Sequence, residues 1–264
     1  MPSSPPPPSP RRKDRLLVVI GSGPGIGAHV AAAFAARGFN RVALVARNQA
    51  KLNRDRAAIV EQQQEGCAGV HVGTYATDIT DHVAFHNTLN RMDEDMGSPA
   101  ECVFYNAATV RPSALLETSE VDMEQEFKVT CTSLHATAKH YVPQLLKLAE
   151  TDPSARPSLL ITGSHLPHRP DPEAFVLSMT KAAQRNMAQS MEHKFGPRGV
   201  HVGLVTVCGV VDPQKKRLNP RFIADRAWDL FNQPREQQEF EVIIQEEGQE
   251  GQEEFEVSIR QGQH

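Results

Sequence analysis

Two hydrophobic rhythms follow one another along the chain. Short runs that are apolar at nearly every position, such as Leu16–Ile20 and Val42–Val45, are typical of strands buried on both faces of a parallel sheet. Longer stretches between them have helical periodicity. We predict strands near 16–20, 41–46, 69–75, 101–105, 158–162, 201–207 and 239–244. We predict helices near 25–37, 48–65, 81–95, 119–149, 173–195 and 220–232.

This alternation predicts one α/β domain with a doubly wound parallel sheet, a Rossmann fold, whose ligands bind at the carboxyl ends of the strands. We expect the domain to span residues 15–246. Residues 1–14 are Pro-rich, have no apolar region and are not a secretory signal, so we expect a disordered arm. Residues 247–264 are rich in Gln, Glu and Gly, and we expect an acidic tail. Within it Glu254–Val257 repeats the sequence of Glu239–Val242, so an additional strand is an alternative for this segment.

The first predicted strand ends at a glycine-rich turn, Gly21–Gly27, which opens an alanine-rich helix. Backbone N–H groups and the positive end of a helix dipole converge at such a turn, as a pyrophosphate requires. Glycine is needed where a Cβ would hold the phosphates away from the backbone. A second strand ends about 20 residues later, which is the context of a dinucleotide site. The turn predicts cofactor contacts from Gly21, Ser22, Gly25, Ile26 and Gly27.

The tip of the second strand predicts which dinucleotide binds. A carboxylate there would hold the ribose 2′-hydroxyl of NAD, but Ala46 occupies the position and Arg47 follows it. Arginine can hold the 2′-phosphate of NADP by a charge-assisted bond. We therefore expect NADP (NADPH), with NAD less favoured. The alternative is that Arg47 is a solvated surface side chain.

Composition excludes several other functions. The 264 residues include 28 basic and 32 acidic side chains, for a formal net charge of −4, and no basic stripe points to nucleic acid. No apolar run approaches the ~20 residues of a membrane helix, so we expect no membrane contact. The histidines lack metal-binding spacing, so we expect no metal. Four cysteines without C-x-x-C pairing indicate free thiols and a cytoplasmic protein.

The spacing Gly21-x-x-x-Gly25-x-Gly27 resembles the opening of the short-chain dehydrogenase/reductase superfamily. Further motifs in the expected order strengthen this resemblance, which covers roughly residues 15–212. It implies adenine contacts from Asp78 and Ile79, adenine-ribose contacts beside Asn106, and a nicotinamide contact from Val211. The superfamily also implies a fold and a nicotinamide cofactor like those predicted from the turn.

The resemblance implies a catalytic serine, a tyrosine 13 residues later, a lysine four beyond it and an asparagine on the central helix. Ser164 and Lys181 match the serine and lysine, and the resemblance implies that Lys181 also holds the nicotinamide ribose of the cofactor. Leu177 stands at the tyrosine position and Thr130 at the asparagine position. Leucine cannot donate a proton, so the chain is similar to an atypical branch without the active-site tyrosine. His165 is a candidate to deliver the proton, since imidazolium is available near neutral pH.

Three functions remain open. The first is an NADP(H)-dependent oxidoreductase with altered proton delivery, acting on a small organic carbonyl or imine. The second is a cofactor-binding pseudoenzyme or scaffold. The third is a non-redox catalyst, for a cyclisation or isomerisation in the same pocket. The first is preferred because Ser164 and Lys181 are retained, although either can be merely structural. The resemblance also implies a homodimer or homotetramer through the helices at 119–149 and 173–195.

Overall fold

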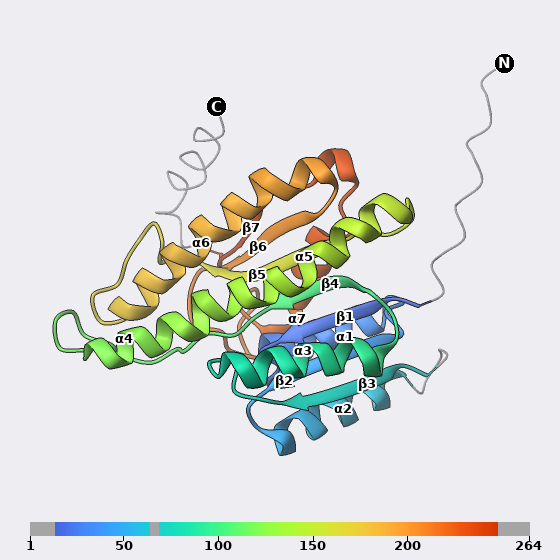
Figure 1. The fold of residues 1–264 in the computed structure, drawn as a ribbon. Helices are drawn as coiled ribbons and strands as arrows, with labels where there is room; N and C mark the ends of the chain where they lie inside the picture. Colours follow the sequence, from blue (N-terminus) through green and yellow to red (C-terminus); the bar gives the residue numbers. More distant parts are fainter. Residues whose placement is uncertain (1–13, 64–68, 248–264) are drawn as a thin grey trace.

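The computed structural model describes residues 14–63 and 69–247. Seven strands form one parallel sheet in the order β3-β2-β1-β4-β5-β6-β7 (Figure 1). The strands are β1 (Leu16–Ile20), β2 (Arg41–Ala46), β3 (His71–Ala76), β4 (Ala100–Tyr105), β5 (Ser158–Ser164), β6 (His201–Val207) and β7 (Glu241–Ile244). The chain reverses its direction of travel across the sheet between β1 and β4, and such a switch point leaves a crevice at the carboxyl ends of the strands.

Helices cover both faces of the sheet (Figure 1). They are α1 (Ile26–Ala35), α2 (Gln49–Gln63), α3 (His82–Met96), α4 (Glu120–Phe127), α5 (Ser133–Thr151), α6 (Phe175–Phe195) and α7 (Pro220–Phe231). Alternate residues of β1 point to opposite faces, as the pleat of a strand requires. Val18 packs in the core under α3, α5 and α6, and Val19 packs in the core under α1, α2 and α7. The predicted doubly wound α/β fold is confirmed.

The single helix predicted near 119–149 is wrong in one respect. A π-helical turn, Lys128–Thr132, separates α4 from α5. The Ser133 hydroxyl lies 2.7 Å from the Lys128 carbonyl oxygen and 2.8 Å from that of Ile79, so it fills the widened turn. A π turn adds a residue without ending the apolar stripe, so periodicity alone does not reveal it.

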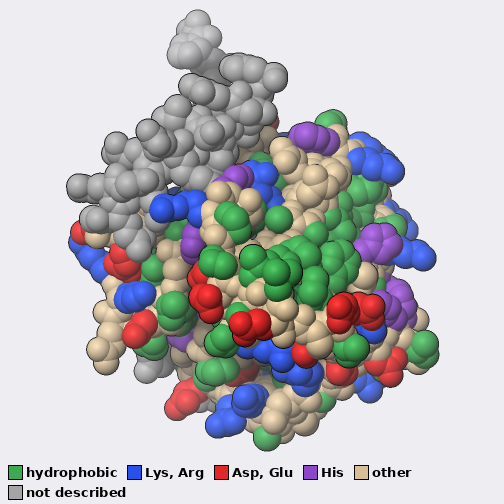
Figure 2. All heavy atoms as spheres, turned by 90° about the vertical axis from the view of Figure 1, so that its left-hand side faces the viewer, with side chains coloured by type: hydrophobic (Ala, Val, Ile, Leu, Met, Phe, Trp, Pro, Cys, Tyr) green, Lys and Arg blue, Asp and Glu red, His purple; other side chains and the backbone are tan. Residues whose placement is uncertain are grey.

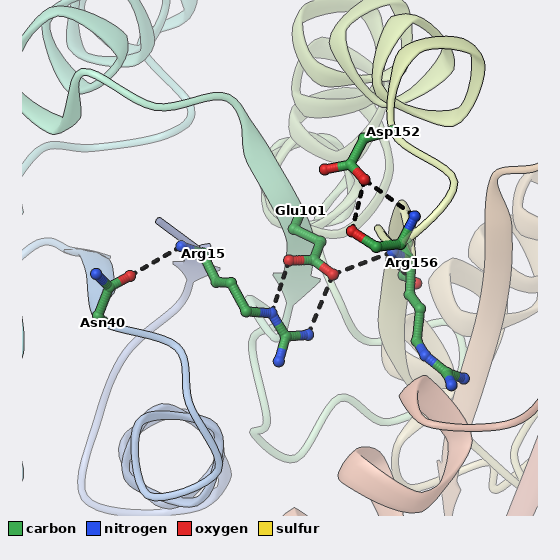
Figure 3. Close-up of polar contacts among 7 residues, drawn as sticks. Arg15, Asn40, Glu101, Asp152 and Arg156 are labelled. Atoms are coloured by element: carbon green, nitrogen blue, oxygen red, sulfur yellow. Dashed lines mark hydrogen bonds and ion pairs between the residues drawn. The ribbon is translucent and has the colours of Figure 1, made fainter. Parts of the chain in front are cut away.

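Charged side chains pair at the end of the sheet where the strands begin, opposite the strand carboxyl ends (Figure 3). The Arg15 guanidinium donates to both carboxylate oxygens of Glu101, at 2.8 and 3.1 Å, and Glu101 is only 1% exposed. The Arg156 backbone N–H donates to the same carboxylate. The Arg156 guanidinium donates to the carbonyls of Asn232 and Gln233, just past the end of α7, where a cation opposes the negative end of the helix dipole. This end of the sheet is therefore held by paired charges and helix-end hydrogen bonds.

Several composition-based expectations can be compared with residues 14–63 and 69–247. None of the helices in these ranges is long and apolar enough to cross a membrane. The same ranges contain no group of side chains arranged to hold a metal ion. Cys102, Cys131 and Cys208 are buried free thiols, as expected. Cys67, the Pro-rich arm through residue 13 and residues 248–264 lie outside the described ranges.

Candidate functional site

The glycine turn is fixed by backbone contacts with its neighbours. Gly21 has φ +96°, and an added Cβ would lie 2.6 Å from the Ala107 backbone nitrogen. Only glycine fits that conformation and that close approach. The Asn106 side-chain amide donates to the Gly21 carbonyl oxygen at 2.9 Å. The turn is thus held against the end of β4, at the switch point.

The start of α1 is open to an anion. Gly25 caps this helix without a side-chain hydrogen bond, and no acidic residue lies in its first turn. Backbone N–H groups at Ile26 and Gly27 therefore have no competing side-chain acceptor. A Cβ added at Gly23 or Gly25 would meet no atom within 4 Å, so the turn presents open space to an incoming group. These features fit the pyrophosphate of a dinucleotide.

Six of the predicted cofactor residues line one cavity of about 280 Å³. They come from the glycine turn, the tip of β2, the segment after β3 and the end of β4. The six are Gly21, Ser22, Arg47, Asp78, Ile79 and Asn106. Residues far apart in the sequence therefore meet where the resemblance expects the adenosine half of the cofactor.

Arg47 is exposed at the tip of β2, with the neighbouring Asn48 oxygen accepting from the Lys51 backbone N–H at the start of α2. Asp78 faces the same cavity. Hydrogen bonds from Thr80 lower the pKa of the Asp78 carboxyl, and the positive charge of Arg47 adds to the effect. Asp78 is therefore ionised, and its negative charge interacts with the positive charge of Arg47. The exposed Arg47 side chain can still reach a phosphate, although the nearby Asp78 carboxylate weakens the attraction of an anion to this place.

A buried chain of hydrogen bonds runs from the glycine turn to the π-helical turn. The Thr162 hydroxyl donates to the Asn106 side-chain oxygen at 2.7 Å. The Lys181 ammonium donates to the Thr162 carbonyl at 2.7 Å and to Gln184 Oε1 at 2.8 Å. Gln184 in turn donates to the Thr130 carbonyl at 3.0 Å. One polar network thus joins the glycine turn to the end of β4, to β5, to α6 and to the π-helical turn.

Lys181 holds a buried charge. Its residue is 6% exposed, and burial lowers the pKa of the ammonium to about 8. Two of its three N–H groups are used by Thr162 and Gln184. Lys181 therefore stays protonated at neutral pH and is held in one place. Thr130, at the position where the resemblance expects asparagine, is 1% exposed, and its hydroxyl has no partner among the described residues.

Ser164 and His165 lie at the end of β5, and the position where the resemblance expects a proton-donating tyrosine is Leu177. Ser164 is half-buried, and its hydroxyl oxygen accepts weakly from the Leu166 N–H at 3.3 Å. Leu177 lies in the first turn of α6, also half-buried. His165, the candidate proton donor, is half-buried, and burial lowers the pKa of its ring, opposed only partly by a hydrogen bond to the Val207 backbone. At neutral pH this ring is mainly neutral.

Val211 follows β6 and is half-buried against the core under α7. The structure therefore places it at the carboxyl edge of the sheet, but not in the cavity that the six adenosine-side residues line. Nearby Cys208 is buried, which raises the pKa of its thiol to about 12. This thiol is therefore not a nucleophile at neutral pH.

Sequence reasoning missed three polar residues of the site. Asp55, in α2, accepts a 2.7 Å hydrogen bond from the Ser22 hydroxyl and is 8% exposed. Thr162 and Gln184 link Asn106 and Lys181, as described above. In the sequence Asp55 and Gln184 are single polar positions on helices. Such residues look like ordinary solvated positions, so no sequence signal separates them from surface.

The fold, the open helix start and the polar cavity together define a dinucleotide-binding α/β protein. The chain belongs to the short chain dehydrogenase family, whose model matches residues 15–221. It is 26% identical to sorbose reductase sou1 of Schizosaccharomyces pombe over 188 residues, which cover 70% of this chain and 69% of that protein.

Solved structures have the same fold. One is an alcohol dehydrogenase from Thermococcus sibiricus in complex with 5-hydroxy-NADP, with a TM-score of 0.75 and 22% identity over 90% of this chain and 98% of that one. Another is an NADPH-bound short chain oxidoreductase with an atypical catalytic center from Pseudomonas aeruginosa. Its TM-score is 0.66, with 23% identity over 77% of this chain and 74% of that one.

Proposed function

We propose that this protein is an NADP(H)-dependent oxidoreductase of the short-chain type whose proton delivery differs from that of a tyrosine-containing site. The observation that carries the proposal is the convergence of the glycine turn, Arg47, Asp78 and Asn106 on one cavity beside an open helix start. Bound NADPH would supply hydride. Two solved relatives in complex with NADP-type cofactors support this choice of cofactor.

Each group has a binding role. N–H groups at the start of α1 would hold the pyrophosphate, and Arg47 the 2′-phosphate. Asp78 and Ile79 would border the adenine. Asn106 holds the glycine turn in place through its hydrogen bond to the Gly21 carbonyl oxygen. Lys181 supplies a fixed positive charge behind the site. The Ser22 hydroxyl donates to the buried Asp55 carboxylate, which fixes the orientation of that hydroxyl.

The acceptor end of the site limits the chemistry. A ketone needs a proton at oxygen as it is reduced, and Leu177 offers none. Burial lowers the pKa of His165, so less of this ring carries the proton at pH 7 than in a free histidine, and little general acid is available. An iminium ion needs no proton at that step, because hydride addition to the cation gives a neutral amine. We therefore propose cationic or strongly activated acceptors as better substrates than ordinary ketones.

Apolar side chains gather on the face at the carboxyl ends of the strands (Figure 2). Val110, Leu115 and Leu116, between β4 and α4, are exposed by 81%, 48% and 93%. This loop is bound to the start of α6, where the Ser113 N–H donates to the Glu173 carbonyl and the Phe175 N–H donates to the Ser113 carbonyl. An apolar border of this kind suits an organic substrate. Assembly as a homodimer or homotetramer through α4, α5 and α6 is also part of the proposal.

The test is a calorimetric titration of the wild-type protein and of Arg47→Ala with NADPH and with NADH. One charge-assisted phosphate contact contributes about 1.5–3 kcal/mol, which corresponds to at least tenfold in affinity. Wild type should bind NADPH at least tenfold tighter than NADH, and Arg47→Ala should lose this preference while keeping its NADH affinity. Equal wild-type affinities, or an unchanged preference in Arg47→Ala, would contradict the proposed specificity.

A further inference from the structure

The sequence of the edge strand β7 occurs twice in the chain. The first copy, Glu239–Ile244, has the sequence EFEVII, and the second copy, Glu254–Ile259, has the sequence EFEVSI. Five of the six positions are identical, at a constant separation of 15 residues. The second copy lies outside the described residues. The contacts of the first copy show what the β6 edge requires of a strand that pairs with it.

The backbone of the first copy completes the sheet. The Leu204 N–H donates to the Phe240 carbonyl at 2.7 Å, and the Cys208 N–H donates to the Ile244 carbonyl at 2.9 Å. Val242 and Ile244 point into the core under α7, with exposures of 7% and 2%. The β6 edge therefore requires two apolar side chains at alternate positions on this face.

The opposite face of β7 requires a carboxylate and an aromatic ring. Glu241, whose side chain is 4% exposed, accepts from the Thr206 hydroxyl at 2.5 Å and from the Arg185 guanidinium at 2.9 Å. Arg185 also lies 5.5 Å from the centre of the Phe240 ring. A strand without both side chains would leave the Arg185 charge partly buried and unpaired, which is costly.

The second copy carries every side chain that these contacts use. Phe255, Glu256, Val257 and Ile259 stand at the positions of Phe240, Glu241, Val242 and Ile244. The difference is Ser258, at the position of the half-buried Ile243. Because the ring, the carboxylate and the two apolar residues are retained in the same order and spacing, the second copy matches both faces of the β6 edge.

We propose that the β6 edge is an interaction surface with two competing occupants from the same chain, and that the second copy can take the place of the first. Exchange lengthens the connection between α7 and the copy from 7 residues, 232–238, to 22 residues, 232–253. Loop closure then becomes only about sixfold less favourable. A tethered segment has an effective concentration in the millimolar range, far above that of a second molecule, so exchange occurs within one chain.

The first copy is the favoured occupant because of the residues that follow it. Glu246 accepts from the backbone N–H groups of Arg217 and Leu218, at 2.9 and 2.6 Å, and Glu247 pairs with Lys216 and Arg217. The corresponding residues after the second copy are Gln261 and Gly262, which carry no charge. Exchange thus releases the segment at 212–218, next to Val211, from its carboxylate anchors. The inference does not depend on the proposed oxidoreductase activity.

The test compares three full-length variants by thermal unfolding at one scan rate. Val242→Asp places a carboxylate in the core position of the first copy, and Val257→Asp does the same in the second. If the copies exchange, Val242→Asp lowers the midpoint by only about 3 °C and the double variant by about 9 °C, because the double variant alone must bury the charge. Val257→Asp alone leaves the midpoint unchanged. Val83→Asp, at an exposed valine of α3, is the matched control.

A milder set, Val242→Ala, Val257→Ala and their combination, applies the same comparison if the charged variants fail to fold. The inference is overturned if Val242→Asp or Val242→Ala alone destabilises as much as its double variant. Light scattering distinguishes exchange within one chain from exchange between chains. The mass of Val242→Asp should match that of wild type over about a hundredfold range of concentration, and a mass that rises selectively in this variant would contradict exchange within one chain.

Discussion

Replacement of Lys181 by methionine should change how the stability of this protein depends on pH. Burial holds the pKa of Lys181 at about 8, against 10.5 for an unburied lysine. Between these values the unfolded chain binds more protons at this residue than the folded chain. Wild-type stability should therefore rise as pH increases through this window, because the folded state no longer holds a buried charge. Methionine has nearly the same length and does not titrate.

The magnitude follows from the two pKa values. The full difference corresponds to about 3.4 kcal/mol, of which about 2 kcal/mol develops between pH 7 and pH 9.5. At pH 7 two effects oppose one another in Lys181→Met. The variant avoids burying a charge, but it leaves the Thr162 carbonyl and Gln184 Oε1 without their donor, at about 1–3 kcal/mol for each unsatisfied group. The change with pH is therefore more decisive than the difference at pH 7.

The assay is urea denaturation of wild type and Lys181→Met at several values between pH 7 and pH 9.5. The free energy of unfolding of wild type, minus that of the variant, should increase by about 2 kcal/mol over this range. Lys139→Met, at an exposed lysine of α5, is the matched control and should give a flat difference. A flat difference for Lys181→Met as well would show that the ammonium is not buried as described.

Two further predictions concern the glycine turn and assembly. Gly21→Ala should destabilise the protein by about 2 kcal/mol or more, because its Cβ would meet the Ala107 backbone at a φ of +96°. Gly23→Ala, with open space around its Cβ, should stay within about 0.5 kcal/mol of wild type in the same denaturation assay, and equal losses would contradict the geometry. Light scattering at micromolar concentration should give a dimer or tetramer, and a monomer would exclude the proposed assembly.

Most of the fold could be predicted because its signals are local. Apolar runs such as Leu16–Ile20 and the glycine turn specify a buried strand followed by a helix, and these elements occur as expected. Chain order then constrains the topology, because parallel strands need crossover helices. The π-helical turn at Lys128–Thr132 could not be predicted, because the Ser133 contacts that accompany it involve a carbonyl far along the chain, that of Ile79.

The convergence of the candidate cofactor residues could be predicted from the sequence, but the polar network behind them could not. Arg47, Asp78 and Asn106 each follow a strand, so their convergence at the carboxyl edge follows from the topology. The partners of Lys181 depend on how α6 packs against β5 and the π-helical turn, which no local pattern encodes. The pKa of His165 also depends on tertiary burial, which lowers it below the ordinary value of histidine and which no local pattern reveals.

The most direct measurement for the central claim is NADPH oxidation with a panel of ketones and a panel of cyclic imines, in wild type, Leu177→Tyr and His165→Ala. A missing general acid costs about 10²–10⁴-fold in rate. We predict slow wild-type ketone reduction, faster imine reduction, and a gain of tenfold or more on ketones in Leu177→Tyr, within the limit set by that cost. Wild-type ketone reduction at ordinary rates, unaffected by His165→Ala, would contradict the proposed proton delivery. If no acceptor consumes NADPH in any variant, the oxidoreductase proposal is wrong, and a cofactor-binding scaffold or a non-redox catalyst takes its place.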